Sequence, residues 1–330
     1  MHENFIQEIT IEITNQCNLR CKVCNIWQEK HRVIPLTGIH QFIKSVATQY
    51  KIGSISITGG EPFLHPQIGK ILQLMYLLRK KGSIRCFDIN TNGYATKKIL
   101  QTLKENREFL EGCHVGISLD GINEKHSEIR GRSNAFKKTF ETIKGIKILF
   151  GDSLKLRVKF TISKFNYDEV YPFYLFCLEN NLMFSPKISE QNVGNYYHRL
   201  ASTLEFSPLL QSSIRESIKQ QLEKIFIEEK KKTAPIIDFA PFSLLIDLVS
   251  HDNFPIKSCQ TPLKCLFITS EQKVFCCLNM EEIGTLQDGV SILFAEKHKK
   301  QVACGLKGDC PGCYSYHGFL NSFNLGTMAP

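Results

Sequence analysis

The sequence predicts an α/β fold: a partial (β/α)6 barrel followed by a small cysteine-rich C-terminal domain. First, strand and helix patterns alternate through the first 200 residues with no run of successive strands, which favours a parallel sheet with right-handed crossovers. Second, six such units are two fewer than a closed barrel contains, so the sheet is expected to stay open. Third, seven of the thirteen cysteines follow residue 258.

The individual elements follow one another in regular order. β-branched and apolar runs predict strands at 8–14, 53–58, 85–91, 113–120, 154–163 and 182–189. Apolar residues at helical spacing predict helices between them, at 36–50, 68–82, 96–106, 136–151 and 168–181. Segment 207–232 then predicts one long helix. We therefore divide the chain into a core at 1–205, a helical connection at 206–238 and a cysteine-rich domain at 239–330.

The composition is that of an ordinary globular protein, with 42% hydrophobic and 22% charged residues. The net charge of +9 favours an acidic partner. Because the Lys and Arg residues are scattered along the sequence, the alternative interpretation is a solvated basic surface, and we do not expect a nucleic-acid partner. No segment approaches the roughly 20 apolar residues of a membrane span, and no secretory signal begins the chain. We expect a cytoplasmic protein with no membrane partner, in which cysteines indicate metal or redox chemistry before disulfides.

Three cysteines lie within eight positions in TNQCNLRCKVCNIW, directly after the first strand: Cys17, Cys21 and Cys24. Structural zinc and most iron–sulfur clusters take four protein ligands. Three thiolates can hold three corners of a four-iron cluster and leave one iron open to a substrate. The alternatives are a zinc knuckle that borrows a distant fourth ligand, and unrelated thiols in a loop.

The ends of the next three strands are also polar and rich in glycine. The second strand ends in TGGEP, the third in NTNG and the fourth in SLDG. Glycines let the backbone approach a ligand closely, and the carboxyl ends of parallel strands meet at one edge of a sheet. We therefore expect these strand ends to surround the cysteine loop.

The spacing Cys17-x3-Cys21-x2-Cys24, followed by GGEP, TNG and SLDG, resembles the radical S-adenosylmethionine (SAM) superfamily. The resemblance covers residues 8 to about 200. It implies a 4Fe–4S cluster held by the three cysteines, with the amino and carboxylate groups of SAM on the open iron. It also implies reductive cleavage of SAM to a 5′-deoxyadenosyl radical, which abstracts hydrogen from a substrate carbon.

The same resemblance implies residues that bind SAM. Gly60 and Glu61 match the element that holds the ammonium group, and Ser118 and Arg130 match positions that hold the carboxylate. Asn92 is a looser match. The sequence departs from the family at Val23, where an aromatic residue is common, and we expect Trp27 to pack in the core rather than replace it. No residue is marked out by position as a proton or hydrogen donor.

The C-terminal cysteines resemble the SPASM/twitch auxiliary-cluster domain of the same superfamily. Cysteines stand before and after a predicted short hairpin, in CQTPLKCLFITSEQKVFCC. Two clusters would need about eight ligands, so we expect one auxiliary 4Fe–4S cluster. Its expected ligands are Cys259, Cys276, Cys310 and Cys313, with Cys265 as a contender. The alternative is a structural zinc site that uses the same thiols.

The resemblance implies an oxidoreductase or maturase-type enzyme. Its expected substrate is a peptide or protein side chain, or a sugar-like small molecule, and its expected electron donor is a flavodoxin or ferredoxin. The chain begins almost at the first strand, which we interpret as leaving no room for an N-terminal peptide-recognition domain. A different functional class is a non-catalytic zinc-binding adaptor, which stoichiometric zinc in place of iron would reveal.

Overall fold

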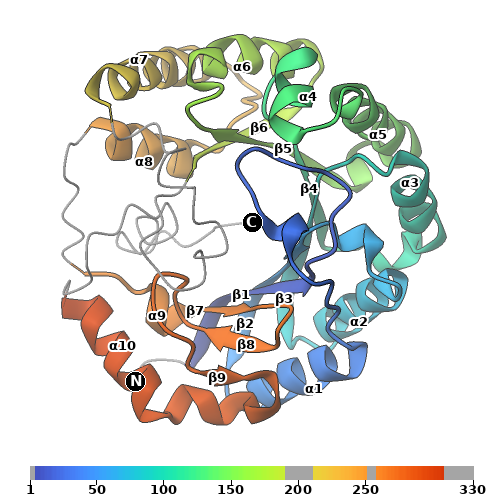
Figure 1. Cartoon of the computed structure of the whole chain (residues 1–330), viewed down its shortest axis with the longest axis vertical. Coiled ribbons are helices and arrows are strands. Elements are labelled where there is room, and N and C mark those ends of the chain that lie inside the picture. The colour runs from blue at the N-terminus through green and yellow to red at the C-terminus, as the bar shows by residue number, and fades with distance from the viewer. Residues whose placement is uncertain (1–3, 190–210, 251–257, 308–330) are drawn as a thin grey trace.

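The computed structural model describes residues 4–189, 211–250 and 258–307, and within them nine strands form one curved sheet (Figure 1). The strands are β1 (Phe5–Thr14), β2 (Lys51–Gly59), β3 (Ile84–Thr91), β4 (Cys113–Ser118), β5 (Lys155–Ile162), β6 (Met183–Ile188), β7 (Cys265–Ile268), β8 (Lys273–Phe275) and β9 (Gly284–Thr285). Their order across the sheet is β6-β5-β4-β3-β2-β1-β7-β8-β9. Strands β1 to β6 are all parallel, which confirms the partial barrel of six β/α units.

The helices lie mainly on the outer, convex side of the sheet (Figure 1). They are α1 (Leu36–Ala47), α2 (Ile68–Lys80), α3 (Thr96–Glu105), α4 (Glu124–Arg130), α5 (Ala135–Phe150), α6 (Val170–Glu179), α7 (Ser212–Glu229), α8 (Phe239–Ser250), α9 (Thr261–Lys264) and α10 (Glu296–Lys307). Short 3-10 helices include η1 (Ile26–Gln28), η2 (Pro62–Leu64) and η9 (Leu286–Phe294). None of these described helices has the length and apolar composition needed to cross a membrane.

The two faces of the sheet differ in polarity because side chains alternate along each strand. The outward residues, such as Ile9, Ile57, Val115 and Phe160, are fully buried against the helices and form the main core. The inward residues of β3 to β5 are largely polar, and they face the concave side. The described helices therefore stabilise the barrel from outside, and polar side chains of β3 to β5 line its concave side.

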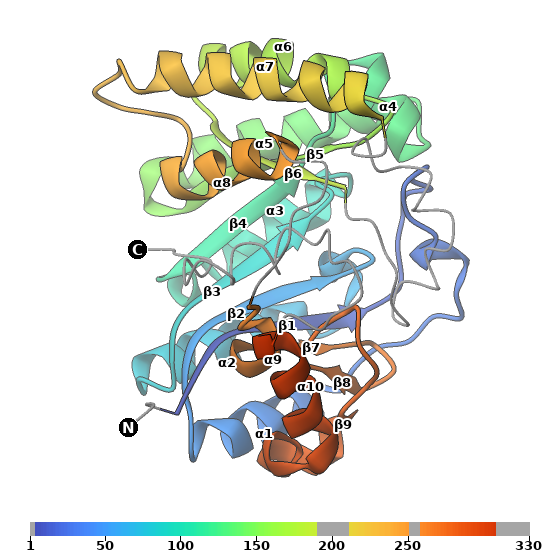
Figure 2. The same cartoon turned by 90° about the vertical axis from the view of Figure 1, so that its left-hand side faces the viewer.

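The C-terminal strands continue the same sheet instead of forming a separate one. β7 pairs in parallel with β1, and β8 and β9 follow as antiparallel strands. The predicted hairpin between the C-terminal cysteines is thus confirmed, with Gln272 of its turn at a φ of +64°. Figures 1 and 2 place α10 beside this end of the sheet and α7 and α8 at the β6 end. The boundaries at 205 and 238 stay a proposal.

Candidate active site

The three cysteines lie on the loop that leaves the carboxyl end of β1 and extends toward α4 (Figure 2). Their side chains belong to one packing cluster, in which Cys21 is buried and Cys17 and Cys24 are half-buried. Trp27 is also half-buried, so the expectation that it packs in the core is wrong. Its Nε1 donates to the carbonyl of Cys24 at 2.8 Å, and the Arg20 guanidinium lies 4.9 Å from its ring centre. Trp27 therefore holds the end of the cysteine loop.

The loop is fixed at its middle by the C-terminus of α4, a helix that the sequence patterns did not predict. The backbone amides of Arg20 and Lys22 donate to the carbonyls of Arg130 and Ile129, at 3.1 and 2.8 Å. Gly131 ends α4 with a φ of +68°, and a Cβ there would lie 2.2 Å from the carbonyl oxygen of Arg20. Only glycine permits this close approach, so α4 and the cysteine loop are packed backbone to backbone.

Arg130 links this helix end to the thiols. Its Nη2 forms an ion pair of 2.6 Å with Oδ2 of Asp120, and its Nη1 lies 3.8 Å from Sγ of Cys21. Asp120 is almost fully buried, and its Oδ1 accepts a hydrogen bond from the amide of Thr161. Nε of Arg130 is buried and has no hydrogen-bond partner. This unused donor points to a group, absent from the polypeptide, that would accept its hydrogen bond.

The two glycines of GGEP bring the end of β2 against the start of the cysteine loop. A Cβ on Gly59 would lie 2.1 Å from the carbonyl oxygen of Thr14, and one on Gly60 would lie 2.4 Å from that of Gln16. The amides of Gly60 and Glu61 donate to those same two carbonyls, each at 2.8 Å. The motif is therefore a tight backbone junction between two strand ends.

The side chain of Glu61 points into this junction and is fully buried. Its Oε1 accepts from the amide of Phe63 at 3.1 Å and from the hydroxyl of Thr91 at 2.8 Å, and its Oε2 accepts from the amide of Asn92 at 2.8 Å. Burial raises the pKa of Glu61 to about 6, while these three donors act in the opposite direction. The carboxylate binds three strand-end donors, so its first role is to hold the corner together.

Asn92 connects that corner to the thiols. Its Nδ2 donates to Oδ1 of Asn18 at 2.8 Å and lies 3.8 Å from Sγ of Cys17. Ser118, at the end of β4, is half-buried and lies in register with Lys159 of β5. Of the residues predicted to bind SAM, the structure thus brings Asn92 and Arg130 to the thiols. Gly60 and Glu61 lie one contact further away.

The residues present fit an iron–sulfur cluster. Burial, with a smaller contribution from the neighbouring thiols, raises the pKa of Cys17 to about 11 and that of Cys24 to about 12. Such thiols ionise only beside added positive charge, which a cluster's iron ions supply. In the described residues, no three or more His, Cys, Asp or Glu side chains are grouped closely enough to hold one metal ion. Cluster ligands bind separate irons, so they need not converge on one point.

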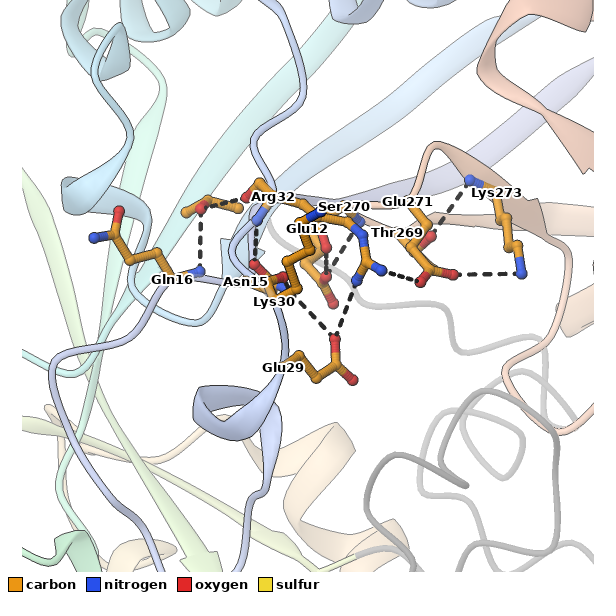
Figure 3. A network of polar contacts seen from close by, with 11 residues as sticks. Glu12, Asn15, Gln16, Glu29, Lys30, Arg32, Thr269, Ser270, Glu271 and Lys273 are labelled. Carbon is orange, nitrogen blue, oxygen red and sulfur yellow. Dashed lines mark hydrogen bonds and ion pairs between the residues drawn. The ribbon is translucent and has the colours of Figure 1, made fainter.

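A second polar network joins the exit of the cysteine loop to the C-terminal hairpin (Figure 3). Arg32 forms ion pairs with Glu29, at 3.8 Å, and with Glu271 of the hairpin turn, at 3.2 Å. The buried carboxylate of Glu12 on β1 accepts hydrogen bonds from the amide and the hydroxyl of Ser270. The segment that leaves the cysteine loop is therefore bound to the C-terminal hairpin.

The C-terminal cysteines lie partly outside the described residues, among them Cys310 and Cys313. Cys259, Cys265 and Cys276 are buried. The amide of Cys259 donates to the carbonyl of Gly305 in α10, and Sγ of Cys276 lies 2.9 Å from Oε1 of Gln301. These contacts bring Cys259 and Cys276 to the same helix, and their role as cluster ligands stays a prediction.

Sequence reasoning missed Asp120, the partner of Arg130. The signal was present, since Asp120 stands in the SLDG motif that was noted for Ser118. It also missed His126 on α4, whose Nδ1 accepts from the amide of Asp120 and whose buried Nε2 has no partner. Burial and the nearby Arg130 guanidinium hold the pKa of His126 well below its usual range, so this histidine is neutral.

Comparison with known proteins shows which protein family this part of the chain resembles. Residues 11–162 match the family model described as the radical SAM superfamily. This segment, a little under half of the chain, carries the similarity to the radical SAM superfamily. The match agrees with the two cofactors predicted for the core, SAM and a 4Fe–4S cluster.

Two curated relatives each match about half of the chain. The antilisterial bacteriocin subtilosin biosynthesis protein AlbA of Bacillus subtilis is 32% identical over 165 residues, which is 49% of this chain and 34% of AlbA. A GTP 3′,8-cyclase of Helicobacter pylori is 28% identical over 172 residues, which is 50% of each chain. The chain thus spans between a third and a half of the length of these relatives.

Solved radical SAM structures share the fold. The structure of anSMEcpe with bound AdoMet superimposes with a TM-score of 0.64 at 16% identity, covering 91% of this chain and 83% of that one. Streptococcus suis SuiB bound to S-adenosylmethionine gives a TM-score of 0.66 at 17% identity, covering 91% and 68%. At these identities the likeness shows the fold alone.

Proposed function

We propose that this radical SAM enzyme abstracts hydrogen from a carbon of a peptide or protein side chain, as an oxidoreductase or maturase. In this reaction one electron, one SAM and one substrate molecule with its C–H bond give methionine, 5′-deoxyadenosine, which has gained the hydrogen atom, and a substrate radical. The observation that carries the proposal is the cysteine loop at the carboxyl edge of the sheet, fixed by α4 and contacted by Arg130 and Asn92. When bound, the cluster supplies the electron that breaks a C–S bond of SAM.

The residues of the chain have distinct roles in this proposal. Cys17, Cys21 and Cys24 would each hold one iron. The unused Nε of Arg130 is a charged donor for a carboxylate, which is the role proposed for it toward SAM. Glu61 orients the amide of Asn92 and thereby the side chain beside Cys17.

A peptide substrate is supported by two relatives. AlbA is described as a bacteriocin biosynthesis protein, and SuiB has been solved bound to the precursor peptide SuiA. The second candidate is a phosphorylated or sugar-like small molecule, which the similarity to GTP 3′,8-cyclases favours. An auxiliary 4Fe–4S cluster on the C-terminal cysteines, and electron delivery by a flavodoxin or ferredoxin, complete the proposal.

Iron counting after anaerobic reconstitution tests the cofactor content. Two clusters give about eight irons per chain and one gives about four, whereas stoichiometric zinc would support the non-catalytic adaptor. Cys21→Ala should abolish dithionite-dependent formation of 5′-deoxyadenosine. Cys177→Ala is the matched control, since this thiol is fully buried in α6, away from the loop. Cleavage at the wild-type rate in Cys21→Ala would refute the assignment of the loop.

The double variant Cys310→Ala/Cys313→Ala tests the auxiliary cluster separately. We expect it to lose about four irons and to retain slow, uncoupled SAM cleavage, while conversion of the true substrate disappears. A structural zinc site predicts protease-sensitive protein instead, because metal-binding energy in such a site is folding energy. Loss of zinc with an unchanged iron count would refute the auxiliary cluster and leave the radical core intact.

A further inference from the structure

The concave face of β3, β4 and β5 carries a cluster of charged side chains that the proposed chemistry at the strand ends does not use. Alternation along the strands places Asp88 and Asn90 of β3, Gly116 of β4, and Arg157 and Lys159 of β5 on this face. The residues between them, such as Val158 and Phe160, belong to the main core on the other face. The cluster is thus part of the barrel interior.

The acidic residue of the cluster, Asp88 on β3, accepts hydrogen bonds from neighbouring side chains. Oδ1 of Asp88 accepts from Nδ2 of Asn90 at 2.7 Å and from the hydroxyl of Ser56 at 3.0 Å. A carboxylate only accepts hydrogen bonds, so the amide nitrogen of Asn90 must face Asp88. The Oδ1 of Asn90 therefore faces away from Asp88, and it is buried without a hydrogen-bond partner.

Lys159 reaches from β5 over β4 toward this orphaned acceptor. A Cβ on Gly116 would lie 2.5 Å from Oδ1 of Asn90 and 2.7 Å from Cε of Lys159. The missing side chain at Gly116 is the space through which the lysine passes. An acceptor buried without a donor costs free energy, and the ammonium group of Lys159 does not supply that donor in this arrangement.

The basic part of the cluster forms no close ion pair, although the carboxylates of Asp88 and Glu8 act on it from a distance. Lys187 of β6 lies one strand beyond Lys159 on the same face, in register with Thr161. Within the described part of the chain, Arg157, Lys159 and Lys187 form no ion pair within 4.0 Å. Burial lowers the pKa of Lys159; the carboxylates of Asp88 and Glu8 raise it, and the cations Lys187 and Arg157 lower it. Three neighbouring cations on a concave surface favour an anionic ligand.

We propose that Arg157, Lys159 and Lys187 bind an anionic group of the substrate, a carboxylate or a phosphate, inside the barrel. Calling this anion part of the substrate rests on the proposed function. Lys159 is in register with Ser118, the last residue of β4, so the subsite begins level with the carboxyl end of β4, at the same edge of the sheet as the cysteine loop. An anion bound here would place the adjoining carbon of the substrate toward that edge.

Calorimetry on the anaerobically reconstituted full chain, without SAM or reductant, tests the subsite. The two probes are sodium pyrophosphate and the carboxylate peptide acetyl-Glu-Glu-Glu-amide, titrated at equal and low ionic strength. Lys159→Met and Lys187→Met each remove one charge-assisted contact, and we expect each to weaken the better probe by about tenfold or more. Lys155→Met is the matched control, since this exposed lysine lies on the same face of β5, further from the edge.

A second variant tests the geometry without changing any charge. Gly116→Ala fills the space through which Lys159 passes, so we expect weaker anion binding from it as well. Circular dichroism melting confirms that each variant is folded before it is compared.

The outcomes distinguish a phosphate from a carboxylate as the bound anion, and failure of the subsite from failure of the proposed function. Preference for pyrophosphate with the expected variant pattern supports the subsite and a phosphorylated substrate, whereas preference for the peptide supports it and an acidic side chain. Equal weakening by Lys155→Met, or no binding of either probe at millimolar concentration, overturns the proposal. SAM cleavage by the wild type is measured on the same preparation. Cleavage without anion binding refutes the subsite alone, and anion binding without cleavage refutes the proposed function.

Discussion

Replacing Glu61 by glutamine changes one buried acceptor at the junction of three strand ends. The carboxylate accepts three hydrogen bonds, from Phe63, Thr91 and Asn92. If the amide oxygen of glutamine keeps the first two, its NH2 group faces the amide N–H of Asn92, and two donors oppose each other. The loss of a charge-assisted hydrogen bond costs about 1.5–3 kcal/mol, and the unsatisfied buried donor costs about 1–3 kcal/mol more.

Part of this cost is offset because a neutral side chain is easier to bury. Burial raises the pKa of Glu61 from 4.5 to about 6, so the ionised carboxylate carries a penalty of about 2 kcal/mol at neutral pH. Glutamine lacks this penalty. We therefore expect Glu61→Gln to lower the free energy of unfolding by roughly 0.5–4 kcal/mol. Because Asn92 also contacts Cys17, the variant should retain its cluster less well.

Anaerobic thermal and urea denaturation measures the first effect, and the decay of cluster absorbance under a chelator measures the second. Glu105→Gln is the matched control, since Glu105 is exposed at the end of α3 and should leave both quantities unchanged. If Glu61→Gln unfolds like the wild type and only its affinity for SAM falls, Glu61 acts on the ligand and not on the corner.

Three further predictions concern other contacts. Arg130→Met leaves Asp120 buried without its cation and should cost about 3–5 kcal/mol, while Arg130→Lys should cost less; equal melting of the two variants would contradict this. Burial and nearby cations lower the pKa of His114 from 6.5 to about 4. As the pH falls, His114 is therefore protonated in the unfolded chain before it is protonated in the folded chain. The wild type should then lose stability as pH falls from about 6.5 toward 4, and His114→Gln should lack that part of the loss; a melting difference that is constant over this range would refute it. Arg32→Met and Glu271→Gln should each lower stability by up to about 1 kcal/mol, and the double variant should lose no more than one of them; additive losses in denaturation would show that the pair is not coupled.

The six β/α units could be predicted because the apolar periodicity of each element is local in the sequence. The pairing of β7 with β1 could not, since it joins Ile11 to Ile268 and leaves no local pattern. The same division holds at the candidate site. The cysteine spacing and the strand-end glycines are local signals and were recognised, whereas the contacts of Arg130 and Glu61 depend on how the loops cross.

The pairing of β1 with β7 has a consequence for the chain during its synthesis. β1 emerges from the ribosome before β2 and β7; it can pair with β2 early, but its other edge lacks the partner strand β7 until residues 265–268 are made. Until then the nascent chain presents the open backbone of Glu8 to Ile11, a template for pairing with other chains. Glu8 and Glu12 place negative charge along this edge, and such charges discourage intermolecular strand addition. A fragment that ends at residue 238 would keep the edge open, so its tendency to aggregate would depend on these two carboxylates.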